Sequence, residues 1–448
     1  MEERNVTDEF VNLLFEKNQS ELPEPVLEKA RCCLMDYVGV TLGGSAENKE
    51  PMDRFLTENV CVGSCHMIGY DRTADCRTAA LVNAYNSHTL ELDDGHRAAM
   101  LHLAAPVFSA LLSVAEERDC LLPDLLRGAV IGYEAAIRVA CAIQPEHKKR
   151  GFHATGTCGA IGSAMAVAAM LNYSMEEMKN ALSAAATSGA GLLEVITGAS
   201  RQKPYNVVNA VSAGINAALF GKYLQGPRDV LGGSRGFLHD FSDGSGTEQM
   251  VKKDASFAIE GIYMKPYAAC RHCHAPVEAT LKLRGDETEH RDMESVESIH
   301  VATYGLAVYG HDHTQIDGSN SAKMSIPYSV AAAWLYGQCG LEMFREDKIH
   351  SRQLLEMAGK VRVTEDPELS VLVPEKRAAV VTVFYKGGES HAYRVDYPKG
   401  EPENPISFEE LKDKFTSIAH TAGRQKEWCD RVVDGIWSKE PVKTLISK

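Results

Sequence analysis

The spacing of apolar residues over the first 250 positions predicts a succession of helices. After Pro25, apolar side chains recur every three or four residues, which places them on one face of a helix, at Val26, Leu27, Ala30, Cys33, Leu34 and Val38. The same spacing predicts helices over residues 78–90 and 106–116. We therefore expect this part of the chain to be all-helical.

Residues 159–171, GAIGSAMAVAAML, carry almost no polar side chain, so they predict a helix that is buried on all sides. Residues 175–188 and 207–220 are similar over much of their length. Ala, Gly and Ser dominate these segments, and small side chains let helices pack closely. A compact bundle with a buried central layer is expected.

Strand composition appears after residue 262. Segments rich in Val, Ile, Thr and Tyr occupy 296–305, 378–385 and 390–395, with helical stretches near 276–284 and 328–336. Residues 408–445 are helical again. We predict a mainly α protein in which one large discontinuous all-helical domain, residues 1–261 and 398–448, carries an inserted smaller α+β lid domain, residues 262–397.

Composition and charge narrow the classes of function. A chain of 448 residues with 44% hydrophobic side chains can build more than one core. Its formal net charge of -14 argues against nucleic acid and anionic membranes as partners, because phosphate groups bind basic faces. The chain has no signal-peptide pattern and no apolar run of membrane-spanning length. We expect a cytoplasmic protein whose 12 cysteines are reduced thiols.

A charged loop follows the helix predicted at 78–90. Glu91-Leu-Asp-Asp-Gly-His-Arg97 contains three carboxylates, a histidine and an arginine, and His102 follows shortly after. In many surface loops such charges serve solubility alone. Here apolar helices flank the loop on both sides, which places it at an end of the bundle, so a functional site and a solvated loop are equal alternatives.

Two further polar segments precede helices of small residues. Arg150-Gly-Phe-His-Ala-Thr-Gly-Thr157 leads into the most apolar helix, whose N-terminal N–H groups suit a carboxylate ligand; an ordinary threonine cap is the alternative. Lys203 enters a nearly apolar bundle, where its charge must be paired or its pKa depressed; a lysine at the surface is the alternative.

Residues 264–274, MKPYAACRHCH, form the densest group of reactive side chains. They include the Cys-x-x-Cys-His pattern of c-type haem, but haem attachment takes place outside the cytoplasm. Zinc could bind Cys270, Cys273 and either His272 or His274. A structural zinc site needs a second ligand pair, however, and Cys61-x-x-x-Cys65 is the only rough candidate. We therefore expect no metal.

Three further patterns have simple structural interpretations. His311-Asp-His313 could bind a metal, but a solvated polar turn is the simpler interpretation. Tyr328 opens a predicted helix and is by default a packed aromatic. Gly189-Ala-Gly191 lies in helical context rather than between a strand and a helix, so neither a dinucleotide nor another cofactor is expected.

The order of these segments resembles the MmgE/PrpD family, which includes 2-methylcitrate dehydratase, cis-aconitate decarboxylase and iminodisuccinate epimerase. The resemblance covers essentially the whole chain and rests on five blocks, residues 90–102, 151–157, 203–214, 265–270 and 326–331. It implies a helical domain built from both ends of the chain, an α+β lid, a homodimer, and a site in the cleft between the domains that binds a small anionic carboxylate.

The resemblance also implies which residues act. Catalytic roles fall on Asp93, His102, His153, Lys203 and Tyr328. Further polar and cationic side chains of the same regions are expected to bind substrate, namely Asp94, His96, Arg97, Thr157, Lys265 and Arg271.

The family's shared chemistry removes a proton from the carbon next to a carboxylate. Cations must stabilise the enolate-like charge, which suits the two lysines. Histidine transfers protons near neutral pH, so we expect His102 and His153 to supply acid–base function. Asp93 and Asp94 would orient these histidines or bind a substrate hydroxyl. Tyr328 would donate a hydrogen bond or a proton.

Three departures from the family's pattern concern the substrate-facing residues. Gly95-His-Arg97 replaces the Thr-Trp that follows the two aspartates. Pro204-Tyr-Asn206-Val-Val208 follows Lys203 where the family often has Arg-Leu-His-x-Gly, and Cys270 stands where the decarboxylase has a histidine. We predict a metal-independent hydro-lyase that dehydrates or hydrates a hydroxy di- or tricarboxylate, as 2-methylcitrate dehydratase does. The alternatives are an epimerase of a dicarboxylate such as iminodisuccinate, a cis-aconitate-type decarboxylase, and a non-catalytic metal- or ligand-binding relative.

Overall fold

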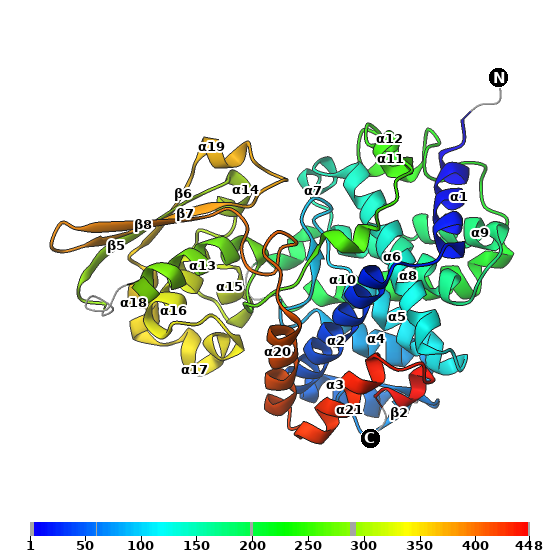
Figure 1. Ribbon diagram of the computed structural model, residues 1–448, viewed down its shortest axis with the longest axis horizontal. Helices are drawn as coiled ribbons and strands as arrows, with labels where there is room; N and C mark the ends of the chain where they lie inside the picture. The colour runs from blue at the N-terminus through cyan, green and yellow to red at the C-terminus, as the bar shows by residue number, and fades with distance from the viewer. Residues whose placement is uncertain (1–3, 60, 198–199, 287–292, 447–448) are drawn as a thin grey trace. The chain divides into compact units, whose positions relative to one another are not determined.

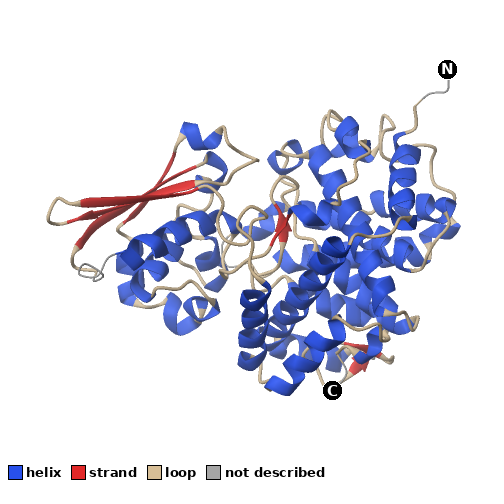
Figure 2. Cartoon of the chain, viewed as in Figure 1, coloured by secondary structure: helices blue, strands red, loops and turns tan. Residues whose placement is uncertain are grey.

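The computed structural model describes residues 4–59, 61–197, 200–286 and 293–446. The chain forms two compact units. The first comprises Met1–Val195, Gln202–Ile262 and Ser407–Lys448, and the second comprises Ile196–Arg201 and Tyr263–Ile406. Figure 2 shows that helices predominate and strands are few, which confirms the mainly α fold class. The predicted domain boundaries at 261/262 and 397/398 stay predictions.

The first unit is built almost entirely from helices, which follow the chain as α1 (Val6–Gln19), α2 (Glu24–Glu47), α3 (Lys49–Glu58), α4 (Cys76–Ser87), α5 (Ala104–Glu117), α6 (Leu122–Ile143), α7 (Glu146–Lys149), α8 (Ala154–Met170), α9 (Met175–Ala186), α10 (Lys203–Leu219), α11 (Phe237–Phe241), α12 (Thr247–Val251), α20 (Phe408–Thr421) and α21 (Lys426–Ile436) (Figure 1). The short strands β1 (Cys65–His66) and β2 (Thr73–Ala74) pair antiparallel. Within the described ranges, no helix combines the length and the apolar character needed to cross a bilayer.

Helix α8 lies at the centre of the first unit. All 17 of its residues are buried, and α5, α6, α9 and α10 pack against it. This burial confirms the prediction from its near-absence of polar side chains. Glycine permits the closest approach, because a Cβ on Gly214 of α10 would lie 2.4 Å from Cβ of Ser163 and 2.9 Å from the carbonyl oxygen of Ala160.

The second unit combines a four-stranded sheet with helices. Its elements are α13 (Arg271–Asp286), β5 (Val296–Thr303), α14 (Gly305–Val308), α15 (Ser319–Met324), α16 (Ile326–Tyr336), α17 (Glu346–Ile349), α18 (Arg352–Ala358), β6 (Val361–Glu365), α19 (Pro367–Ser370), β7 (Ala379–Tyr385) and β8 (Ser390–Val395). The strand order is β6-β5-β7-β8, with β5 and β6 parallel and the other pairs antiparallel. Helix α13 packs on β7 and β8, and α16 packs on α13, α18 and β6.

Strand β7 was predicted from its β-branched and aromatic residues, and its burial alternates as in a strand that is covered on one face. Every second side chain is buried, as expected where helices cover one face of a sheet. The predicted strands at 296–305, 378–385 and 390–395 are all present. Strand β6 was not predicted, because its sequence VRVTE is short and charged, which is usual for an edge strand.

Replacing Gly214 by alanine should destabilise the first unit. The added methyl group would overlap a backbone carbonyl of α8 that cannot move without displacing the central helix, so the free energy of unfolding should fall by about 1–3 kcal/mol. Thermal unfolding followed by circular dichroism measures the change. The control is Gly285→Ala in α13, where a Cβ meets nothing within 4 Å. Equal midpoints for the two variants would contradict the packing argument.

Candidate active site

The loop between α4 and α5 carries several of the predicted site residues. It includes the two-residue strand β3 (Gly95–His96). Glu91 and Met100 have φ angles of 55° and 53°, the left-handed region, which costs a non-glycine residue on the order of 1–2 kcal/mol. Such backbone strain persists only where the surroundings fix the conformation, and it is frequent at functional sites.

Asp93 is a buried carboxylate shared by two imidazoles. Its Oδ2 lies 2.7 Å from Nδ1 of His88 and 3.3 Å from Nδ1 of His102. Burial alone would raise the pKa of Asp93, but the charges of His102 and His88 and their hydrogen bonds outweigh burial and hold it well below the usual range. Asp93 is therefore an anion at neutral pH.

The hydrogen bonds of His102 fix the position of its ring proton. Nδ1 lies 2.6 Å from the carbonyl oxygen of Asp94, and a carbonyl can only accept. Nδ1 therefore carries the proton, and in the neutral ring the lone pair resides on Nε2. The backbone N–H of His102 also donates to Oγ1 of Thr155 at 3.1 Å, which holds the residue against the start of α8.

Asp94 anchors the same loop to α5. Its Oδ1 accepts the backbone N–H groups of Leu103 and Ala104 at 3.1 and 2.9 Å, and the Tyr133 hydroxyl donates to Oδ2 at 2.7 Å. Burial and the neighbouring charge of Asp93 outweigh these three bonds and raise the pKa of Asp94 to about 7. The side chain thus caps a helix N-terminus and is close to half-protonated at neutral pH.

His153 precedes α8 and has a defined tautomer. Nδ2 of Asn206, on α10, donates to Nδ1 of His153 at 3.1 Å and to the carbonyl oxygen of Leu192 at 3.2 Å. Because Nδ1 accepts, the neutral ring carries its proton on Nε2. Burial, followed by the charge of Lys203, holds the pKa of His153 well below its usual range, so the ring is a neutral N–H donor.

Lys203 begins α10 and forms an ion pair with Glu91. The lysine side chain is 15% exposed and the glutamate side chain 6% exposed. Proline at the next position suits the first turn of a helix and fixes where α10 starts. Glu91, in the strained loop, is therefore the partner that the Lys203 charge was predicted to need inside an apolar bundle.

His88 links the predicted residues and was itself not predicted. Its ring centroid lies 4.8 Å from that of His102 and 5.9 Å from that of His153. Within the described ranges, the buried atoms Nε2 of His88 and Oδ1 of Asp93 have no hydrogen-bond partner. Leaving buried polar atoms unpaired costs free energy, so this arrangement is expected where a ligand completes the hydrogen bonds.

The structure also places the other predicted residues of the first unit, whose substrate-binding role stays a prediction. Nδ1 of His96 accepts the backbone N–H of Ala99 at 3.1 Å, and Arg97 lies half-buried in the same turn. Oγ1 of Thr157 lies 2.9 Å from Nε2 of His147, inside the bundle. Sequence reasoning also missed Tyr133, which lies in the apolar helix α6, and the role of Asn206, which the sequence marked only as a departure from the family's pattern.

Three predicted residues belong to the second unit. Lys265 is fully buried. The Arg271 guanidinium forms a buried ion pair with Glu401 at 2.8 Å. Tyr328 is also fully buried, and its hydroxyl donates to the carbonyl oxygen of Met343 at 2.6 Å, a contact that ties α16 to the segment before α17.

Two groups of side chains have the composition of a metal site. One is His88, Asp93 and His102, and the other is Cys270, His272 and His311; within each group the candidate ligand atoms lie within 4.8 Å of one another. In the first group, Nδ1 of His88 donates to the Asp93 carboxylate, and Nδ1 of His102 donates to the Asp94 carbonyl oxygen. Hydrogen bonding among the three side chains therefore accounts for their approach without an ion.

Comparison with known proteins places these observations in a family. Residues 8–250 match the MmgE/PrpD N-terminal domain, and residues 267–439 match the MmgE/PrpD C-terminal domain. Two Aspergillus proteins are each 26% identical to the chain. They are a cis-aconitate decarboxylase-like protein of Aspergillus oryzae, aligned over 98% of this chain and 95% of its own length, and a cis-aconitate decarboxylase of Aspergillus terreus, aligned over 99% and 96%. A human cis-aconitate decarboxylase is 24% identical over 93% of this chain and 88% of its own length.

Stability should depend on the protonation of Asp94. Its folded pKa of about 7 lies above the ordinary 3.8, so the folded protein binds more protons than the unfolded chain between those values. The resulting stability is lost as pH rises through about 7. In Asp94→Asn, the thermal midpoint should fall less than in the wild type between about pH 5 and 8, since asparagine does not titrate. The exposed Asp413→Asn is the control, and parallel curves for Asp94→Asn and wild type would refute the assignment.

Proposed function

Because this chain belongs to the MmgE/PrpD family, we propose that it is a lyase that removes a proton from the carbon next to a carboxylate of a small di- or tricarboxylate. The observation that carries the proposal is a group of three neighbouring imidazoles, in which His88 and His102 contact an ionised Asp93 and His153 stacks on His88. Together with Lys203, this group provides a proton acceptor in His102, a neutral donor in His153 and a cation, all within the first unit. The names of the relatives support the lyase class, since two are cis-aconitate decarboxylases and one is a cis-aconitate decarboxylase-like protein.

His102 is the proposed base. Its Nδ1–H is held by Asp93 and by the Asp94 carbonyl, so Nε2 has the lone pair that accepts the proton. The Asp93 carboxylate orients the ring and stabilises the imidazolium that forms, as in other carboxylate–imidazole pairs. That imidazolium can then return the proton, to a departing hydroxyl or to carbon.

His153 is the proposed donor to the substrate carboxylate. A neutral imidazole with its proton on Nε2 can stabilise negative charge that develops on a carboxylate oxygen as the carbon loses its proton. Lys203 would bind the same carboxylate by exchanging its partner Glu91 for the substrate. Arg97 and Lys265 remain proposed substrate-binding groups by their charge. Arg271 remains a proposal by the family resemblance alone, because its charge is already paired with Glu401. No proton-transfer step is assigned to Tyr328, because its hydroxyl donates to Met343.

Dehydration of a hydroxy acid, or the reverse hydration, is the first proposed reaction. His102 would take the proton from carbon and deliver it to the leaving hydroxyl, so that water departs and a carbon–carbon double bond forms. Decarboxylation is the second candidate, favoured by the names of the relatives. There the bond that breaks joins carbon to the carboxylate that leaves as carbon dioxide. His102 would enter this reaction as the imidazolium, so that its Nε2–H can protonate the carbanion that remains.

An exchange assay tests the proposal. The purified chain is incubated in D₂O with a panel of hydroxy, amino and unsaturated di- and tricarboxylates and followed by NMR. At least one acid should incorporate deuterium next to a carboxylate. His102→Gln should slow that incorporation by about 10²–10⁴-fold with an unchanged circular dichroism spectrum, because it removes the base. The exposed His420→Gln in α20 is the control.

The products separate the reactions. A new alkene with loss of water indicates a dehydratase, release of carbon dioxide a decarboxylase, and exchange with inversion alone an epimerase. Exchange into none of the acids would refute the proposed function, and exchange unaffected by His102→Gln would refute the assigned base.

The tautomer of His153 gives a second test. Aspartate at position 206 would accept a proton from Nδ1 instead of donating to it, which would move the ring proton away from Nε2. Asn206→Asp should therefore lower kcat about tenfold or more, while Asn206→Ala should lower it less. Steady-state kinetics with the substrate found in the panel measures both. A larger loss for Asn206→Ala than for Asn206→Asp would contradict the tautomer argument.

A further inference from the structure

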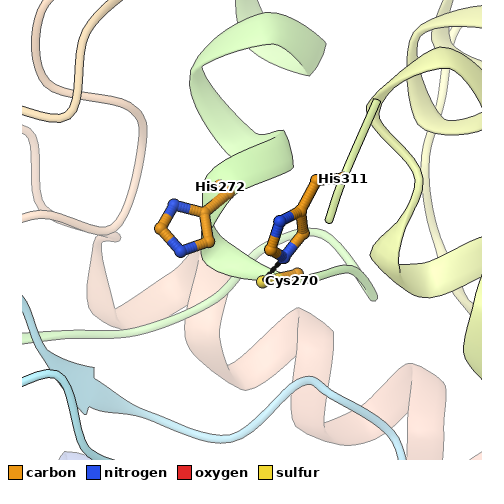
Figure 3. A group of neighbouring side chains, drawn as sticks. All are labelled: Cys270, His272 and His311. Atoms are coloured by element: carbon orange, nitrogen blue, oxygen red, sulfur yellow. Dashed lines mark hydrogen bonds between the residues drawn. The ribbon is translucent and has the colours of Figure 1, made fainter. Parts of the chain in front are cut away.

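A second group of reactive side chains lies in the unit that does not contain the imidazole cluster. Figure 3 shows His272 and His311 flanking Cys270. Sγ of Cys270 lies 3.3 Å from Nε2 of His311, and the candidate ligand atoms of all three residues lie within 4.8 Å of one another. The rings of His272 and His311 meet edge to face, with centroids 4.7 Å apart.

Backbone hydrogen bonds fix the positions from which these side chains project. The N–H of Cys270 donates to the carbonyl oxygen of Lys323 at 2.8 Å. The N–H of His311 donates to Val308 at 3.1 Å, and the His311 carbonyl accepts from Ile326 at 2.8 Å. His272 lies in the first turn of α13. The three residues are therefore held together before any ligand arrives.

Both histidines are oriented through Nδ1. Nδ1 of His311 donates to the carbonyl oxygen of Tyr309 at 3.0 Å, so its Nε2 carries the lone pair that faces the cysteine sulfur. Nδ1 of His272 lies 2.6 Å from the Tyr304 hydroxyl. Histidines that bind metals are usually held in this way, with one ring nitrogen hydrogen-bonded and the other turned to the ion.

We propose that Cys270, His272 and His311 bind a Zn²⁺-type cation. One thiolate and two imidazoles form a set of three protein ligands that leaves a fourth tetrahedral position for water or another ligand. Zinc bonds of about 2.0–2.3 Å place tetrahedral ligand atoms roughly 3.3–3.6 Å apart, and the separation of Sγ from Nε2 of His311 already has this value. A set of sulfur and nitrogen ligands disfavours Mg²⁺ and Ca²⁺, which prefer oxygen.

Charge and access are compatible with a cation. Arg271, next to Cys270, is neutralised by the buried carboxylate of Glu401. Cys270 is half-buried, whereas His272 and His311 are 8% and 7% exposed. An ion can therefore reach the thiolate from solvent and be enclosed by the two rings.

The proposal replaces the expectation, drawn from spacing, that no metal binds here. Cys273 is fully buried, with Sγ 4.0 Å from the Lys323 carbonyl oxygen. His274 contacts Arg271 through Nδ1 and the Ala269 carbonyl through Nε2, at 2.8 and 3.1 Å. Of the Cys-x-x-Cys-His pattern, only Cys270 is therefore a proposed ligand; His272 lies at one of its intervening positions, and His311 comes from the separate His-x-His pattern.

Cobalt(II) provides the test, because a tetrahedral cobalt thiolate has both intense visible bands and a near-ultraviolet sulfur-to-metal charge-transfer band. The full chain is treated with a chelator, desalted and titrated with Co²⁺. One equivalent should bind, with the charge-transfer band, and Zn²⁺ should displace it. Cys270→Ser should abolish that band, and His311→Gln should weaken binding about tenfold or more, in line with the loss of one ligand.

Control variants distinguish this site from metal binding elsewhere in the chain. Cys61→Ser and His313→Gln should leave the spectrum unchanged, and so should His102→Gln, which alters the candidate ligand group of the first unit. Circular dichroism verifies that each variant folds; if Cys270→Ser did not, His311→Gln with its matched control His313→Gln decides. Absence of the charge-transfer band in the wild type, or its persistence in Cys270→Ser, would overturn the proposal. None of these outcomes depends on the proposed lyase activity.

Discussion

The burial of an ionised Asp93 is the constraint on which the arrangement of the candidate active site depends. A carboxylate removed from water must be compensated locally, and here two imidazoles supply that compensation through a single oxygen. The position of His102 follows from this contact and from its bond to the Asp94 carbonyl. The strained backbone at Glu91 and Met100 brings the loop into the conformation in which these bonds form together.

Much of the helical fold could be predicted from the sequence because its central helices contain few polar side chains. Helix α8 contains almost no polar side chain, which leaves burial on all sides as the only stable arrangement. The strands β7 and β8 were predicted from their β-branched and aromatic residues. Strand β6 could not be predicted, because the strand is formed by pairing with β5, which lies far away in the sequence. The five residues VRVTE alone do not indicate that pairing.

The candidate site was only partly predictable, for a geometric reason. Polar segments at 91–97 and 150–157 mark where side chains of functional type occur, and the first of them contains Asp93 and Asp94. The partners that set protonation lie elsewhere: Asn206 on α10 holds His153, Tyr133 on α6 holds Asp94, and His88 ends a helix. In the second unit, sequence spacing grouped Cys270 with Cys273, whereas the fold groups it with His311.

The pairing of Lys203 with Glu91 has a consequence for selectivity. In the proposed reaction, a substrate carboxylate that binds Lys203 would have to displace the Glu91 carboxylate, which carries the same charge and is already paired with the lysine. Exchange of one ion pair for another yields little net free energy, so an anion that offers a single charged group gains almost nothing by entering. If Lys203 binds substrate as proposed, the pair would disfavour small anions with one charged group and favour molecules that bring several oxygen ligands at once.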